Sequence, residues 1–283
     1  MTVKKLLVGI LFMGLSLAIG QPTDPVQTDE GSLSGWVLDQ KTGLSVFRGI
    51  RYAEPPMKYM RWRPPQPVKP WKGIKFCQLY GPASPQKLGK SATQHLSEDC
   101  LFLNIWSTKV NQLEAKLPVM VWIHGGGLNR SWSHKEMYDG SAFAERGVVL
   151  VSINYRLGAL GFLVHPALSA ESERGVSGNY GMLDQIEALK WVRNNIAAFG
   201  GDPDNVTIFG ESAGGTSVAV LCSSPLAKGL FHRAIAQSPW LFGFLDNLVE
   251  PSFAHLKKPI VNTPSAEDIG VKWAKAHTEK TDA

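Results

Sequence analysis

A serine surrounded by small residues is the position in this chain whose type and spacing best suit chemistry. The run Gly210-Glu211-Ser212-Ala213-Gly214-Gly215 follows the β-branched stretch NVTIF and precedes the apolar stretch SVAVL. Gly-x-Ser-x-Gly between a strand and a helix forms a sharp turn, so Gly210 and Gly214 are expected to be steric requirements. The turn places the hydroxyl at a helix N-terminus, where developing negative charge is stabilised. The pattern predicts that Ser212 is a nucleophile; the alternative is a glycine-rich turn without chemistry.

A second glycine-rich run follows a different predicted strand. His124-Gly125-Gly126-Gly127 comes directly after the apolar stretch VMVWI. Consecutive glycines let backbone N–H groups approach a substrate oxygen closely, as an oxyanion hole requires. Such a loop acts with the N–H of the residue after the nucleophile, which is Ala213 here. We expect an oxyanion hole at this loop, with an ordinary strand-end turn as the alternative.

Both runs need a sheet to position them, and the sequence from residue 101 onward predicts one. Four apolar runs rich in β-branched residues read LFLNIW, LPVMVWIHG, GVVLVSINY and NVTIFG. Several lack strict alternation, as expected for strands covered on both faces. Between the third and fourth runs, apolar residues recur at helical spacing from Tyr180 to Gly201. This alternation indicates an α/β fold with a mainly parallel central sheet.

Signals at the two ends complete the predicted elements. Residues 32–53 alternate as β-strands do, with a turn at Lys41-Thr42-Gly43, and predict an N-terminal β-hairpin. A final helix is expected to start near Ser265, with Ser265 and Asp268 as a capping pair.

Composition narrows the class of protein. Of 283 residues, 44% are hydrophobic and 19% charged, so the chain can bury a substantial core and is not generally disordered. The formal net charge of +5, without a dense basic run, does not indicate nucleic-acid binding. No set of His, Asp and Cys has the spacing of metal ligands, so we expect no metal and no cofactor.

The N-terminus has the layout of a secretory signal peptide. Lys4 and Lys5 precede an apolar run that ends in Ala18-Ile19-Gly20. This apolar run is shorter than a typical membrane-spanning helix. We expect cleavage after residue 20 and a mature chain, residues 21–283, that is secreted or periplasmic and not held in the membrane. A membrane anchor and a buried N-terminal helix are the alternatives.

Export would permit disulfides among the three cysteines. A bridge between Cys77 and Cys100 would close a loop of about 20 residues and stabilise the fold by about 3 kcal/mol. Two free buried thiols are the alternative. Cys222 lies in the apolar stretch VAVLC and is expected to be a small buried residue rather than a nucleophile.

From about residue 31 to residue 240 the sequence resembles the type-B carboxylesterases, a family that includes the cholinesterases. The resemblance rests on FRGIRYAEPP, SEDCLFLN, WIHGGG, NYRLGALGFL, GNYGMLDQ, WVRNNIAAFGGDPDNVTIFGESAGG and PLAKGLFHRAIAQS, in that order. It implies the α/β-hydrolase fold and hydrolysis of small-molecule carboxylic esters through an acyl-enzyme on Ser212.

The resemblance also implies roles for individual residues. Those that form or support the site are the oxyanion donors Gly126, Gly127 and Ala213, the buried carboxylate Glu211, and His124 with Gly125. For Glu211 the alternative is a solvated turn residue. Those that stabilise the fold are the disulfide partners Cys77 and Cys100 and the ion pairs Arg61–Glu98 and Arg156–Asp184.

Some stretches depart from the family pattern. Residues 78–99 contain no tryptophan whose ring could hold a quaternary ammonium, which argues against choline esters. Arg51 and Lys58 stand where the family more often has proline and glycine, and LNRSWSHKEMYDG after the glycine run is also unusual. The resemblance therefore says least about the entrance to the site.

The rest of a catalytic triad is the part that the chain does not display. A serine needs a histidine to accept its proton, and in this fold the order is serine, acid, histidine. Only His232, His255 and His277 follow Ser212, and none follows a predicted strand as a triad base should. We expect the chain to be the N-terminal portion of a single carboxylesterase domain, to lack the acid and base, and to be inactive alone.

Other functions on this fold stay open at this point. One is a non-catalytic adhesion or binding relative, although such members tend to lose the serine that this chain keeps. Another is a lipase, thioesterase or amide hydrolase that uses the same nucleophile.

Overall fold

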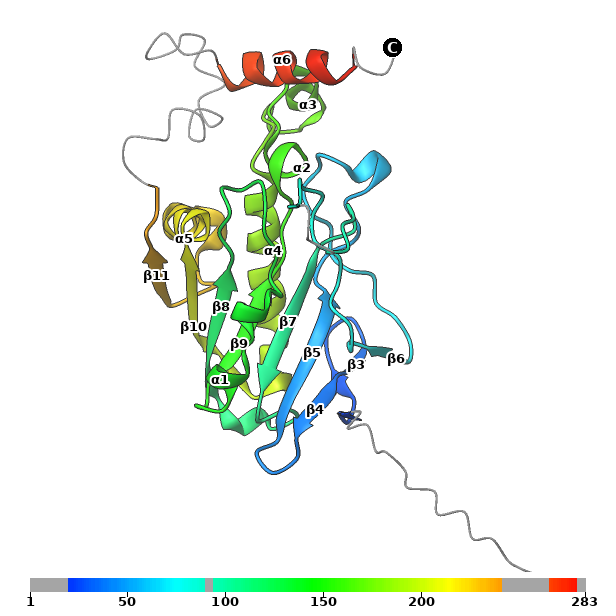
Figure 1. The fold of residues 1–283 in the computed structure, drawn as a ribbon, viewed down its shortest axis with the longest axis vertical. Helices are drawn as coiled ribbons and strands as arrows, with labels where there is room; N and C mark the ends of the chain where they lie inside the picture. The colour runs from blue at the N-terminus through cyan, green and yellow to red at the C-terminus, as the bar shows by residue number, and fades with distance from the viewer. Residues whose placement is uncertain (1–19, 90–93, 241–264, 279–283) are drawn as a thin grey trace, which may run out of the picture.

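The computed structural model describes residues 20–89, 94–240 and 265–278. They form an eight-stranded sheet flanked by helices, and a separate three-stranded sheet (Figure 1). The expected signal peptide lies almost wholly outside the described residues. Within the described ranges, no helix is long and apolar enough to cross a membrane.

The large sheet is mixed and has the strand order β1-β4-β5-β7-β9-β8-β10-β11. The bounds are β1 Gln21–Pro22, β4 Trp36–Asp39, β5 Leu44–Arg51, β7 Phe102–Ser107, β8 Leu117–Ile123, β9 Val149–Ile153, β10 Gly201–Glu211 and β11 Arg233–Gln237. Neighbours are parallel from β9 to β11 and antiparallel from β1 to β9, with β4 and β5 forming the predicted hairpin. The expected parallel arrangement therefore describes the half of the sheet that carries both glycine runs.

The small sheet and the helices complete the fold. The small sheet contains β2 Val26–Gln27, β3 Ser32–Ser34 and β6 Ile74–Phe76. The helices are α1 Ser141–Ala144, α2 Gly158–Phe162, α3 Pro166–Glu171, α4 Tyr180–Asn195, α5 Ala213–Ser223 and α6 Ala266–Thr278. At the start of α6, the Asp268 carboxylate accepts from the Ser265 hydroxyl at 2.7 Å, and the Asp268 N–H donates back at 3.1 Å. This is the predicted capping pair.

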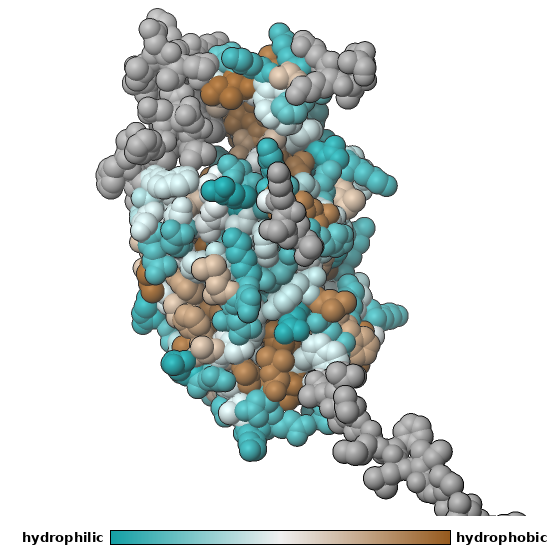
Figure 2. All heavy atoms as spheres, viewed as in Figure 1, coloured by the Kyte–Doolittle hydropathy of each residue, from teal (hydrophilic) through white to brown (hydrophobic). Residues whose placement is uncertain are grey.

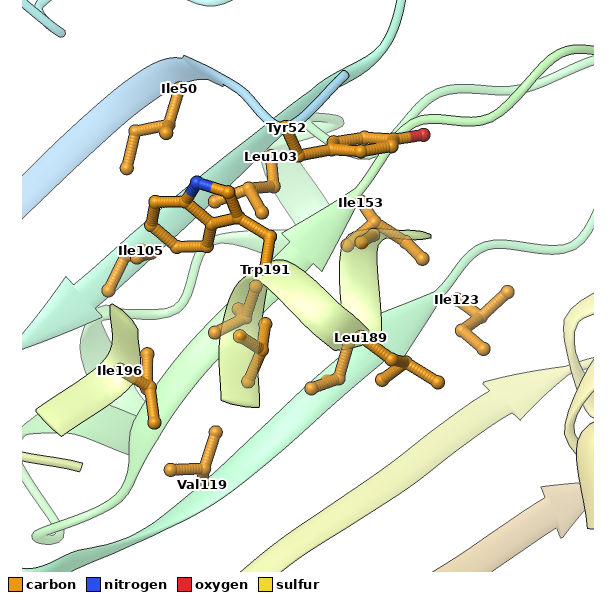
Figure 3. Close-up of a cluster of buried hydrophobic side chains, with 14 of the residues drawn as sticks. Ile50, Tyr52, Leu103, Ile105, Val119, Ile123, Ile153, Leu189, Trp191 and Ile196 are labelled. Atoms are coloured by element: carbon orange, nitrogen blue, oxygen red, sulfur yellow. The ribbon is translucent and has the colours of Figure 1, made fainter. Parts of the chain in front are cut away.

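Two apolar clusters lie on opposite faces of the large sheet. The larger packs α4 against the strands, with Leu189 and Trp191 facing Ile153 and its neighbours (Figure 3). The smaller includes Leu150 and Trp106. In β9, Val149, Val151 and Ile153 belong to the larger cluster and Leu150 to the smaller, which explains why apolar residues follow one another without alternation. On the outer surface, hydrophilic side chains cover much of the face seen in Figure 2, with apolar patches between them.

The cysteines correct two expectations. Cys77 and Cys100 are free buried thiols, so the predicted disulfide is not formed. Each is packed into the larger apolar cluster, and burial raises the pKa of Cys77 to about 12 and the pKa of Cys100 further. Neutral thiols react poorly, since the thiolate is the nucleophile. Cys222 is exposed rather than buried because the period of α5 turns Leu221 and Val218 inward and Cys222 outward.

Candidate active site

Ser212 sits in a strained turn between β10 and α5. β10 ends at Glu211, α5 begins at Ala213, and Ser212 has φ 58° and ψ −123°. Such a conformation costs about 1–3 kcal/mol for a residue with a side chain and persists only where the surroundings hold it. The Ser212 N–H donates to the Gln237 carbonyl of β11 at 2.9 Å, and the Ser212 carbonyl accepts from the Thr216 N–H at 2.9 Å. The sheet and the helix therefore both hold the turn.

The glycines of the turn are sterically required, as their spacing predicts. A Cβ at Gly210 would lie 2.6 Å from the carbonyl oxygen of Ile123 and equally close to Gly214. A Cβ at Gly214 would overlap that same Ile123 oxygen, and one at Gly215 would lie 2.5 Å from the Gln237 oxygen. The turn therefore packs directly against the ends of β8 and β11.

The glycine loop after β8 approaches this turn closely. A Cβ at Gly125 would lie 2.5 Å from the Glu211 carbonyl oxygen and 3.2 Å from Cβ of Ser212. Gly126 and Gly127 have φ of 106° and 66°, values that favour glycine. Ala213 opens α5, and the first N–H groups of a helix have no acceptor within it. The structure thus brings the loop, Ser212 and Ala213 together.

His124 supports the glycine loop through its buried side chain, which is neutral. Its side chain is buried, stacks on Tyr155 with ring centroids 4.4 Å apart, and donates through Nδ1 to the Gly125 carbonyl at 2.9 Å. The Tyr155 hydroxyl donates to the His124 carbonyl at 2.7 Å. Burial lowers the pKa of His124 to about 4, so the ring carries no charge at neutral pH. Tyr155 lies 31 residues away in the chain, and the sequence did not reveal its role.

A cavity of about 280 Å³ opens beside these residues. Its lining comes from the loop before residue 90, the glycine loop, the unusual stretch after it and Glu211. The lining residues are Gln86, Lys87, Leu88, Gly89, Gly125, Gly126, Arg130, Ser131, Trp132, Lys135, Tyr138 and Glu211. Residues that depart from the family pattern therefore line a cavity together with the glycine loop and Glu211, the residue before Ser212.

Comparison with known proteins decides the family. A sequence model described as the carboxylesterase family matches residues 22–245. This chain belongs to the carboxylesterase family. Its fold is the α/β-hydrolase fold shared by the solved carboxylesterases that it resembles.

Individual carboxylesterase relatives match the chain over most of its length. Fumonisin B1 esterase of Sphingopyxis macrogoltabida is 47% identical over 242 residues, which is 82% of this chain and 45% of that protein. Phenmedipham hydrolase of Pseudarthrobacter oxydans is 43% identical over 83% of this chain and 47% of that protein. The structure of carboxylesterase EST55 from Geobacillus stearothermophilus superposes with a TM-score of 0.68 at 46% identity, over 75% of this chain and 42% of that one. The chain spans less than half the length of these relatives.

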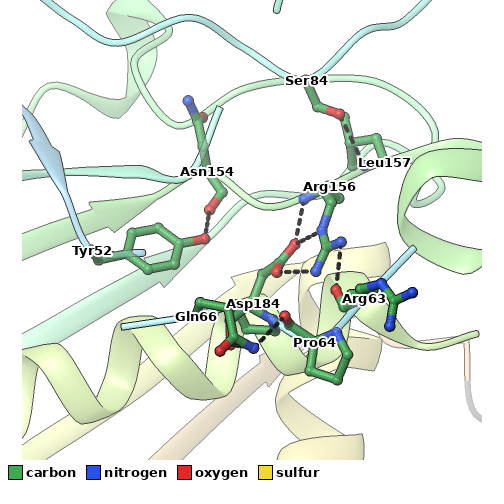
Figure 4. Close-up of polar contacts among 10 residues, drawn as sticks. Tyr52, Arg63, Pro64, Gln66, Ser84, Asn154, Arg156, Leu157 and Asp184 are labelled. Atoms are coloured by element: carbon green, nitrogen blue, oxygen red, sulfur yellow. Dashed lines mark hydrogen bonds and ion pairs between the residues drawn. The ribbon is translucent and has the colours of Figure 1, made fainter. Parts of the chain in front are cut away.

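Both ion pairs implied by the family are present. Arg61 pairs with Glu98 through two hydrogen bonds of 2.7 and 2.6 Å. Arg156 binds Asp184 through Nε at 2.8 Å and Nη2 at 2.7 Å, with both side chains buried (Figure 4). Burial works to lower the pKa of Arg156, but the Asp184 carboxylate outweighs it and raises that pKa.

An ion pair between Arg51 and Asp99 was not predicted. The Arg51 guanidinium binds the Asp99 carboxylate at 2.6 and 2.7 Å. Arg51 was noted only as a departure from the family pattern. The adjoining acidic residue, in the run Ser97-Glu98-Asp99, was the available signal.

Glu211 differs from the expectation. The resemblance implies a buried carboxylate, but Glu211 is exposed and lines the cavity. It stays close to the loop, since a Cβ at Gly125 would lie 3.3 Å from its Oε2. In the described part of the chain, no element covers it.

The histidines after Ser212 do not reach it. Nδ1 of His232 accepts from the Val206 N–H at 3.2 Å, in the middle of β10 and away from its carboxyl end. His277 lies on α6, where Nδ1 donates to the Trp273 carbonyl at 2.8 Å. His255 lies outside the described residues. Among the residues that are described, no histidine hydrogen-bonds to the Ser212 hydroxyl.

Proposed function

We propose that this chain carries the nucleophile and oxyanion hole of a serine carboxylic-ester hydrolase that acts through an acyl-enzyme on Ser212. The observation that carries the proposal is the contact of the glycine loop with the strained serine turn, in a chain of the carboxylesterase family. Two sets of N–H groups, from Gly126 with Gly127 and from Ala213, then face one reacting centre. This arrangement suits a tetrahedral oxyanion.

The proposed reaction has two balanced steps. Oγ of Ser212 bonds to the ester carbonyl carbon and passes its proton, through a base, to the departing alcohol oxygen as the ester C–O bond breaks. Water then attacks the acyl-enzyme, and its proton returns to Oγ while the acid is released. The N–H donors stabilise the oxyanion in both steps. We propose that none of the chain's own histidines serves as the base, so the chain alone turns over slowly.

Labelling with a fluorophosphonate probe tests the nucleophile. We expect slow labelling of the chain, faster labelling when imidazole is added as an external base, and none in Ser212→Ala. Ser223→Ala is the matched control, since Ser223 lies exposed at the far end of α5. Labelling that survives in Ser212→Ala, or no labelling with imidazole, would overturn the role of Ser212. Rapid ester turnover by the chain alone would overturn the proposal that none of its histidines serves as the base.

The name of one relative supports a thioester as the alternative substrate. Medium-chain fatty acyl-CoA hydrolase precursor of Anas platyrhynchos is 42% identical over 81% of this chain. Ester and thioester forms of one acyl group, compared as competitors of the fluorophosphonate label, separate the two substrates. We expect the oxygen ester to compete better.

We also propose that residues 1–20 direct export and are then removed. The charged start and short apolar run support this. N-terminal sequencing of the protein from its native host should begin at Gln21; a start at Met1 or Thr2 would contradict it.

A further inference from the structure

The cavity beside Ser212 has a strongly cationic lining. Lys87, Arg130 and Lys135 line it, against a single carboxylate, that of Glu211. Two of the three cations belong to the stretch after the glycine run that departs from the family pattern. The basic character is therefore a property of this chain's own entrance.

Hydrogen bonds join the loops that carry two of these cations. The Gln86 side chain donates to the Ser131 carbonyl at 2.9 Å and accepts from the Ser131 N–H at 2.7 Å, which ties the loop of Lys87 to the loop of Arg130. The Arg130 N–H donates to the Gly126 carbonyl at 3.2 Å. The backbone of Arg130 is therefore hydrogen-bonded to that of Gly126, a proposed oxyanion donor.

Lys135 is held beside them by aromatic rings. Its Nζ lies 5.0 Å from the ring centre of Trp132 and 5.8 Å from that of Tyr138, and both rings line the cavity. Burial, followed by the charge of Arg130, lowers the pKa of Lys135. Two positive charges are therefore close enough to repel one another, and an anion between them would relieve that repulsion.

No acidic side chain neutralises the three cations within the described ranges. Arg51, Arg61 and Arg156 each have a carboxylate partner, whereas Lys87, Arg130 and Lys135 have none. A cavity in which three cations face one carboxylate and none of them forms an ion pair, next to an acyl-transfer site, matches a substrate that brings negative charge itself.

We propose that the substrate is an ester that carries a free carboxylate near its scissile bond, and that Arg130 and Lys135 bind this carboxylate. The inference rests on the proposed function of Ser212. Arg130 supplies a planar fork suited to a carboxylate, and Lys135 supplies a second positive charge. Neutral esters of the same size lack this contact.

Binding to the full chain with Ser212→Ala tests the substrate class without turnover. Monomethyl glutarate carries the free carboxylate, and dimethyl glutarate is its neutral counterpart. In NMR titrations we expect the monoester to bind about tenfold more tightly, which corresponds to about 1.4 kcal/mol. Higher ionic strength should weaken only the monoester. Adding Arg130→Gln and Lys135→Gln should remove the preference, whereas Lys41→Gln, in the distant β4–β5 turn, should keep it.

The outcomes separate this inference from the proposed function. Equal affinity for the two esters, no saturable binding of the monoester, or a preference that survives both charge substitutions overturns the inference. If the double variant does not fold, the salt dependence and the exposed single variant Arg130→Gln decide. Failed fluorophosphonate labelling with intact monoester preference overturns the nucleophile and leaves the anion site.

Discussion

At the residue scale, Ser212 keeps a costly backbone conformation because its neighbours leave room for no other. The Gln237 carbonyl and the Thr216 N–H form hydrogen bonds with its backbone. The absence of a side chain at Gly214 lets the start of α5 approach the Ile123 carbonyl closely. The strain exposes the hydroxyl at the end of the sheet. The stability of the turn and the reactivity of the serine are therefore set by the same contacts.

Gly214→Ala should destabilise the chain by about 3 kcal/mol or more, because a Cβ there would overlap backbone atoms that cannot move aside. Urea unfolding measures the loss. Gly89→Ala is the control, since a Cβ at Gly89 would meet nothing within 4 Å, and it should change stability by less than about 1 kcal/mol. Equal losses in the two variants would show that the turn is not sterically limited.

His124 makes the stability depend on pH. Burial lowers its pKa from 6.5 to about 4, so between these values the unfolded chain binds a proton that the folded chain excludes. The free energy of unfolding should fall by about 2 kcal/mol as the pH drops from 7 to 4.5. Above pH 6.5 the neutral His124 ring costs the folded chain no stability. His134, whose pKa burial also lowers to about 4, adds to this loss.

Urea titrations at pH 7 and pH 4.5 measure that difference. His124→Asn should reduce the pH dependence, whatever its effect at pH 7. An identical pH dependence in His124→Asn and the unmodified chain would contradict the assignment.

At the element scale, ion pairs join segments that are far apart in the chain. Arg156 follows β9 and Asp184 lies in α4, so this pair fixes the helix that covers the sheet. Arg51 ends β5 and Asp99 precedes β7, so this pair joins two adjacent strands. The first pair is 2% and 0% exposed, whereas the second is 23% and 28% exposed.

Asp184→Asn should cost about 3–5 kcal/mol, because it leaves the Arg156 charge buried without a counter-charge. Asp99→Asn should cost at most about 1 kcal/mol, since water screens and solvates Arg51. Both substitutions change one carboxylate to an amide, so the free energies of unfolding can be compared directly. A similar loss in both would show that burial does not govern the cost.

Elements with a strong local pattern were predictable, and those set by distant contacts were not. The helical period of residues 180–195 and the apolar runs of β7 to β10 marked the core and the two glycine runs. Their apolar patterns carry no information on strand direction, so the antiparallel pairing of β7 with β9 was missed. Cys222 was wrongly predicted to be buried, because its apolar sequence neighbours do not show that the helix turns this residue outward.

At the scale of the whole molecule, the surroundings of Glu211 explain why one expectation from the family is not met. Glu211 is exposed because no described element packs over the carboxyl end of β10. The serine, the glycine loop and two ion pairs are arranged without such a cover. The serine turn and the glycine loop are therefore organised by contacts local to β8, β10 and α5.

The edge of the large sheet at β11 is also uncovered in the described chain. β11 pairs with β10 on one side, and all five of its residues are exposed. No strand of the described chain pairs with its other edge, and Ile235 there is 45% exposed. Unpaired strand edges with apolar side chains recruit strands of other molecules.

The chain should therefore self-associate through β11 as its concentration rises. Ile235→Lys should shift the weight-average mass, measured by sedimentation equilibrium, toward the monomer, because a charge on an edge strand opposes strand addition. Val220→Lys is the matched control, since Val220 is 42% exposed but lies on α5 rather than on a strand edge. If both lysines lower the mass equally, general apolar contact explains the association. If neither does, self-association through the edge of β11 is ruled out.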